Sequence, residues 1–315
     1  MSPDASHESP SRAPARTVFD RDALKRAAGV AGALVCLVAL ALLIRRGLAL
    51  GDALGDALAR TPVAALLAAL ALYLVGGLLL AGAWVGLVRL AAGRRLPALP
   101  LAVGHLRAQL AKYLPGNVFH LAWRHVAARR AGADHRALAL ALLLETVLVS
   151  AGAALLALGV VADPRLDGIA PWARHVVWLA PGVALLAWIA AGWIGHRTGA
   201  PQLALQRSGV SLLAVLALYV GMFVCSALAL RSLSPSPDAL PFGAWCGWLS
   251  LAWLVGYVTP GAPAGIGLRE AVLSLGLAPV LGEAEALALA LLYRLVTTVA
   301  DGVLAAIGFL DRSAS

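Results

Sequence analysis

Five charged residues lie within or directly beside long apolar stretches of the chain, where an ion is costly. They are Glu145, Arg269, Glu270, Arg294 and Asp301. A charge in the hydrocarbon core costs roughly 2.5–3.5 kcal/mol on insertion scales, so it usually has a partner or a function. Arg294 and Asp301 are seven residues apart and therefore share one helix face. These groups could bind an anionic substrate and balance its charge. Alternatively, they form structural ion pairs between helices, for example Arg294 with Glu145.

Polar and charged residues also surround the first of two Pro-Gly breaks. The site residues predicted here are Lys112, Tyr113, Pro115, Gly116, Asn117 and Arg124. A helix that begins near Asn117 has free backbone N–H groups and the positive end of its dipole at the break. Such an end can bind a phosphate, and Lys112 and Arg124 would add cationic donors. The alternative is a basic patch, with Arg129 and Arg130, that only faces lipid head groups.

The second break has a similar local sequence. Tyr257 precedes Val-Thr-Pro-Gly there, as Tyr113 precedes Leu-Pro-Gly at the first break. We expect the two breaks to form two sites that open from opposite faces of a membrane. Glu145 and Asp301 are predicted as charge-pairing or relay groups. The substrate-binding residues predicted at the second break are Pro260, Gly261, Gly267, Arg269 and Glu270, joined by Arg294.

The composition favours a membrane protein. Of the 315 residues, 61% are hydrophobic and only 13% are charged, and the mean hydropathy is +0.85. Soluble domains average about 45–50% apolar and about 25% charged residues. The composition therefore argues against a soluble enzyme, a disordered regulator and a disulfide scaffold. It predicts an all-α polytopic membrane protein.

Six apolar runs are long enough to cross a hydrocarbon core of ~30 Å. Two shorter apolar runs, 101–114 and 242–258, each end at a Pro-Gly break, which interrupts a helix. Paired interrupted segments are typical of transporters built from inverted repeats. The alternative is chance placement of Pro-Gly pairs in a chain with 32 glycines. The six predicted spans are 27–44, 63–88, 137–162, 176–195, 209–230 and 286–309.

The sequence predicts two membrane repeats, 27–162 and 176–309. Each would contain three crossings and one broken or re-entrant helical hairpin, and an odd number of crossings inverts the second repeat relative to the first. Residues 1–26 are predicted as a flexible cytoplasmic tail, and 310–315 as a short cytoplasmic tail. Most Lys and Arg residues then fall on the inner side, which predicts that both termini are cytoplasmic.

Neither a nucleic acid nor a cofactor is predicted as a partner. The net charge of +9 is explained by topology and by anionic lipid head groups, because the chain has no basic and aromatic binding motif. The three cysteines are far apart in apolar segments, and His120 and His125 do not share a helix face, so no metal site is predicted. Phosphate-loop and dinucleotide-binding motifs are also missing.

Three runs of residues carry a resemblance to a known family. They are Lys112-Tyr113-Leu114-Pro115-Gly116-Asn117 through Arg124, Thr259-Pro260-Gly261 through Gly265-Ile266-Gly267-Leu268-Arg269-Glu270, and Tyr293-Arg294. With these runs, residues 27–309 resemble the membrane domain of the lysylphosphatidylglycerol synthase transmembrane, or flippase-like, family, without its aminoacyltransferase domain. The resemblance implies a bacterial cytoplasmic (inner) membrane location and the movement of lipids such as aminoacylated phosphatidylglycerol. Other members accompany hopanoid or polyprenyl-linked sugar pathways.

The residues and the resemblance together predict a flippase-like protein rather than an enzyme. It would translocate or handle an anionic lipid or lipid-linked head group, so its expected partner is a membrane phospholipid or a polyprenyl-linked lipid. One alternative is a non-catalytic membrane partner of a lipid-modifying or glycosyltransferase enzyme. Another is a membrane-embedded enzyme that uses Glu145, Glu270 and Asp301.

Overall fold

The structure is a computed structural model of the chain. It describes residues 21–113, 119–161, 205–259 and 263–310. Within these ranges the regular structure is entirely helical, with ten α-helices and two short 3₁₀ helices. The all-α class predicted from the composition is therefore confirmed for the described part of the chain.

Four of the described helices are long and apolar enough to cross a membrane. The shortest apolar part among them has 22 residues, which extend about 33 Å at ~1.5 Å per residue and so exceed the ~30 Å hydrocarbon core. The chain could thus be a multi-pass membrane protein. The four helices are α3 (Val63–Ala92), α6 (His135–Val161), α8 (Leu205–Leu233) and α11 (Glu283–Leu310).

These helices correspond to four of the six predicted spans, 63–88, 137–162, 209–230 and 286–309, which are confirmed as long apolar helices. The predicted span 176–195 lies outside the described residues.

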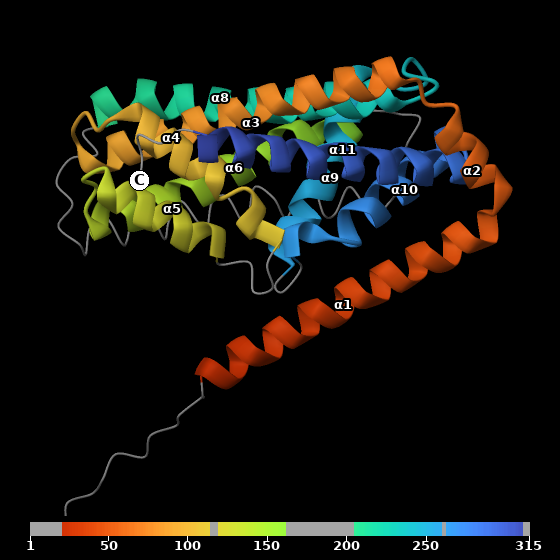
Figure 1. The fold of residues 1–315 in the computed structure, drawn as a ribbon, viewed down its shortest axis with the longest axis horizontal. Coiled ribbons are helices and arrows are strands. Elements are labelled where there is room, and N and C mark those ends of the chain that lie inside the picture. The colour runs from red at the N-terminus through yellow and green to blue at the C-terminus, as the bar shows by residue number, and fades with distance from the viewer. Residues whose placement is uncertain (1–20, 114–118, 162–204, 260–262, 311–315) are drawn as a thin grey trace, which may run out of the picture.

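Helix α1 (Arg21–Leu50) contains the predicted span 27–44 and begins within the region predicted as a flexible tail. In Figure 1 the helix runs away from the bundle formed by the others. Near its C-terminal end, Arg46 Nη2 lies 2.9 Å from Glu283 Oε1 at the start of α11. Gly51 has a positive φ of 46° and turns the chain into the short helix α2 (Asp52–Ala59).

Both apolar runs that end at a Pro-Gly break fold as interrupted helices. The first consists of α4 (Ala98–Arg107), the 3₁₀ turn η1 (Leu110–Tyr113) and α5 (Phe119–Arg130). Its first described helical residue after the break is Phe119, close to the start predicted near Asn117. The break residues Pro115, Gly116 and Asn117 lie outside the described residues.

The second interrupted helix has the same plan. It consists of α9 (Phe242–Val258), the 3₁₀ turn η3 (Pro263–Gly265) and α10 (Leu268–Leu281). Pro260 and Gly261 lie outside the described residues. Gly265 and Gly267 follow the break with positive φ angles of 69° and 83°, which glycine adopts without a Cβ clash. The chain can therefore turn sharply between α9 and α10.

The packing brings the two interrupted helices into contact with long helices and with each other. Helices α3 and α8 lie side by side (Figure 1), α6 packs against α9, and α4 packs against α11. Where α6 crosses α9, an added Cβ on Gly247 would lie only 2.6 Å from the backbone nitrogen of Val160, so glycine is required for this close approach. The turns η1 and η3, which flank the two breaks, contact each other.

Candidate functional site

A cavity of about 520 Å³ lies among the helices, and residues from both interrupted helices line it. The two groups of residues expected to form separate sites therefore share one cavity. All seven charged residues that the sequence singled out as site residues line this cavity: Lys112, Arg124, Glu145, Arg269, Glu270, Arg294 and Asp301.

Arg124 on α5 and Glu145 on α6 form a bidentate ion pair. Nη1 donates to Oε1 at 2.8 Å, and Nη2 donates to Oε2 at 2.7 Å. The Arg124 guanidinium also lies 4.4 Å from the ring centroid of Trp84 on α3, and the residue is 4% exposed. Paired planar groups of this kind give strong, directional hydrogen bonds. The pair fixes the helix after the first break against a long helix.

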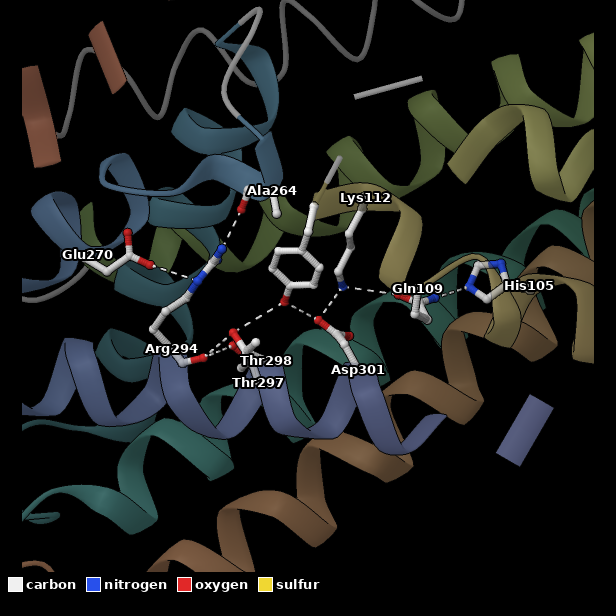
Figure 2. Close-up of polar contacts among 10 residues, drawn as sticks. His105, Gln109, Lys112, Ala264, Glu270, Arg294, Thr297, Thr298 and Asp301 are labelled. Atoms are coloured by element: carbon white, nitrogen blue, oxygen red, sulfur yellow. Dashed lines mark hydrogen bonds and ion pairs between the residues drawn. The ribbon is translucent and has the colours of Figure 1, made fainter. Parts of the chain in front are cut away.

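Asp301 on α11 holds the turn η1 by two contacts. Its Oδ2 lies 2.8 Å from Lys112 Nζ and accepts a hydrogen bond of 2.6 Å from the Tyr113 hydroxyl. Figure 2 shows Lys112 reaching this carboxylate, and Lys112 also donates to Gln109 Oε1 at 3.1 Å. Because Asp301 is 1% exposed, its charge depends on these partners rather than on water.

Arg294, also on α11, contacts the second break. Its Nε lies 3.5 Å from Glu270 Oε1, and its Nη1 donates to the carbonyl oxygen of Ala264 at 3.2 Å (Figure 2). The other Glu270 oxygen accepts a hydrogen bond of 2.6 Å from the Gly267 amide, which caps α10. The predicted ion pair of Arg294 with Glu145 is therefore corrected. Each residue has a nearer partner on the helix that follows a break.

Among the cations that line the cavity, Arg269 on α10 has no carboxylate partner in the described residues. It forms no ion pair or hydrogen bond with any described residue, and its Nε is buried without a partner. Its guanidinium carbon lies 5.8 Å from the ring centroid of Trp253, within the range of a cation–π contact. Four cations and three carboxylates line the cavity, so one positive charge remains uncompensated among the described residues.

Aromatic and neutral polar residues complete the wall, and sequence reasoning did not identify them as site residues. Trp253 and Tyr257 stack with centroids 4.5 Å apart, and Tyr73 meets Tyr293 edge to face at 6.4 Å. His105 belongs to the same wall. A histidine within the apolar run 101–114 was a usable signal, whereas aromatic residues in apolar helices are too common to stand out.

His105 contacts two polar side chains, Arg124 and Gln109. Its Nδ1 is 3.2 Å from Arg124 Nη1, and its Nε2 is 2.9 Å from Gln109 Nε2. An arginine nitrogen can only donate, so a His105 ring that accepts from it is uncharged. His105 therefore adds a polar group but no charge to the cavity.

The described part of the chain has no group of three His, Cys, Asp or Glu side chains that could hold a metal ion. No protein-family model matches the chain, and no curated protein matches it. The resemblance to the lysylphosphatidylglycerol synthase transmembrane family therefore stays a prediction, which rests on the sequence runs around the two breaks and on Tyr293-Arg294.

Proposed function

We propose that this protein is a multi-pass protein of the cytoplasmic membrane that binds the anionic head group of a lipid in its cavity and moves it across the bilayer. The observation that carries the proposal is Arg269, a cation without a carboxylate partner in the described residues, which lines the internal cavity. Its Nε atom is buried without a hydrogen-bond partner among the described residues, which is costly. An anionic ligand would supply that partner.

The proposal includes six spans and two interrupted hairpins in two inverted repeats. The order of long helix, interrupted helix and long helix occurs twice in the described chain. It runs from α3 to α6 and again from α8 to α11. The packing between the two halves is reciprocal. Helix α4 of the first half contacts α11 of the second half, and α9 of the second half contacts α6 of the first half. Two related halves that enclose a site between them are expected to pack in this reciprocal way.

The ion pairs follow the same plan. In the first half, Arg124 after the break pairs with Glu145 on the closing long helix. In the second half, Glu270 on α10, after the break, pairs with Arg294 on the long helix α11. Here the carboxylate lies on the interrupted helix and the cation on the long helix, the reverse of the first half. Each pair links the helix after a break to a long helix. This arrangement supports a carrier in which the halves change position around one cavity.

The cavity suits a head group that leaves its acyl or prenyl chains in the surrounding lipid. Three carboxylates neutralise three of the four cations that line the cavity. Few unpaired ions of the protein would therefore face the hydrocarbon while a head group crosses the bilayer. The apolar surfaces of the long helices, with exposed residues such as Leu67, Leu78 and Leu295, suit contact with lipid chains.

Translocation by the purified full chain in phosphatidylcholine vesicles tests the proposal. The probe is phosphatidylglycerol with a fluorescent acyl chain, and dithionite bleaches only the probe in the outer leaflet. We expect the protein to make the inner pool available for bleaching. Arg269→Gln should slow the bleaching of the inner pool by about tenfold, which corresponds to the loss of one interaction of about 1.4 kcal/mol.

Arg60→Gln is the matched control, because Arg60 is exposed and lies outside the cavity. It should translocate the probe at the unchanged rate. A folded protein that moves no more probe than empty vesicles would contradict the proposed function, and equal rates for Arg269→Gln and Arg60→Gln would remove Arg269 from it.

A further inference from the structure

We infer that the cavity selects lipids whose head group carries a single negative charge, as a phosphodiester does. The inference rests on the proposed function and names the substrate class of the same site. It follows from the charge that the described residues leave uncompensated, and from the way in which Arg269 is held.

Three of the four cavity cations are already neutralised by contact. The nitrogen-to-oxygen distances are 2.8 Å for Lys112 and Asp301, 2.7 Å for Arg124 and Glu145, and 3.5 Å for Arg294 and Glu270. The remaining guanidinium, that of Arg269, can therefore neutralise one negative charge. Residues 114–118 and 260–262, at the two breaks, contain no charged side chain.

The charge of the ligand then decides how well it fits. A phosphodiester brings one negative charge and leaves the cavity neutral. A diphosphate brings at least two, so one of them would be buried without a partner, which is costly even after the surroundings relax. A zwitterionic head group brings its own cation next to Arg269, and a cationic aminoacyl head group adds to the positive charge. We therefore expect all three to bind more weakly than a monoanion.

Arg269 is held in a slot that two glycines create. An added Cβ on Gly256 would lie 2.9 Å from Arg269 Nε, and one on Gly265 would lie 2.7 Å from the same atom. The side chain of Arg269 thus lies against the backbones of Gly256 in α9 and Gly265 in η3, and its guanidinium carbon is 5.8 Å from the ring centroid of Trp253. A guanidinium confined in this way is positioned for a ligand before the ligand arrives, which lowers the ordering cost of binding.

Competition between lipids of different charge tests the inference. The full chain is purified and equilibrated with equal amounts of phosphatidylglycerol, phosphatidylcholine and a prenyl diphosphate, and native mass spectrometry counts each bound lipid. We expect phosphatidylglycerol to be bound in preference to both others. Arg269→Lys keeps the charge and should keep this preference. Arg269→Gln should lower the bound ratio of phosphatidylglycerol to phosphatidylcholine by about tenfold.

Arg269→Glu extends the series, because it makes the cavity negative. With aminoacylated phosphatidylglycerol added to the mixture, this variant should favour the cationic lipid, whereas the unchanged protein should not. Arg60→Gln controls for a general effect of removing an arginine, and size-exclusion chromatography checks that each variant is folded. A preference of the unchanged protein for the diphosphate, or equal lipid ratios in Arg269→Gln and Arg60→Gln, would overturn the inference.

The outcomes separate this inference from the proposed function. Translocation that depends on Arg269, together with a preference for the diphosphate, would keep the proposed function and reject the single-charge rule. Failure to bind or move any anionic lipid would reject both. Soluble glycerophosphoglycerol, added as a competitor, identifies the source of the phosphodiester. If glycerophosphoglycerol displaces the bound lipid, the result supports a water-soluble phosphodiester as the ligand. If it does not, the result supports the lipid as the ligand.

Discussion

Lys112 Nζ and Asp301 Oδ2 lie 2.8 Å apart and join the first break to the last long helix. The two residues are separated by 189 positions in the sequence, and their contact connects the two halves of the chain. Tyr113, the neighbour of Lys112, donates to the same carboxylate. Arg294 on the same helix donates to the carbonyl of Ala264 in the second break. Helix α11 thus contacts the turns η1 and η3 that flank the two breaks.

The Lys112–Asp301 pair should be important for stability. Asp301→Asn leaves the Lys112 ammonium without its counter-ion, and breaking a buried pair from one side typically costs about 3–5 kcal/mol. We expect a lower unfolding temperature for the detergent-solubilised variant. The double variant Lys112→Gln/Asp301→Asn removes both charges and should recover part of the loss. Strictly additive effects of the two substitutions would show that the residues are not coupled.

The sequence indicated which charges matter but not how they pair. Glu145 and Arg294 were identified because an apolar run makes any charge conspicuous. Their mutual pairing, the example given for a structural ion pair, does not form, since the folding of α5 beside α6 gives Glu145 a closer partner in Arg124. Such partners depend on tertiary packing between segments far apart in sequence, which no local pattern contains. For the same reason the shared cavity was not anticipated.

Local patterns were sufficient for the helices themselves. The apolar run Phe242–Val258 is an α-helix with those same bounds, because Pro241 and the Thr259-Pro260 pair limit it at either end. The aromatic wall at Trp253 and Tyr257 was missed, because a tryptophan or tyrosine in an apolar helix has the same sequence signature whether it packs, anchors or lines a cavity.

Arg124→Lys tests the geometry of the first ion pair rather than its charge. Lysine cannot reproduce the two parallel hydrogen bonds to Glu145 or the contact of a planar group with Trp84. We expect a loss of about 1–3 kcal/mol in the free energy of unfolding, the range for hydrogen bonds to charged groups. Arg130→Lys, at an exposed position on the same helix, should change the unfolding temperature little. Equal shifts for the two variants would contradict the structural importance of the bidentate contact.

Gly276→Ala tests the packing of α10 against α9. An added Cβ would lie within 2.6 Å of three ring carbons of Trp248, a fully buried side chain. Overpacking of this kind costs typically 1–3 kcal/mol, roughly the loss we expect in unfolding free energy. The matched control is Gly302→Ala in α11, where no atom lies within 4 Å of the added Cβ. There alanine should stabilise the helix by about 0.8–1 kcal/mol. Destabilisation by both substitutions would show that the contact with Trp248 is not the cause.

Ala264→Gly tests the backbone of the second break. Ala264 is the non-glycine residue with a positive φ, 49°, in the described chain. An L-residue pays roughly 1–2 kcal/mol for this left-handed conformation, whereas glycine adopts it readily. Because the Ala264 carbonyl accepts from Arg294, the fold holds the residue in this state. We expect Ala264→Gly to raise the free energy of unfolding by about 0.5–1 kcal/mol after the larger entropy of the unfolded glycine chain is included. Ala271→Gly, within helix α10, should lower it by about 1 kcal/mol. Equal losses for both variants in a denaturant titration would mean that Ala264 carries no backbone strain.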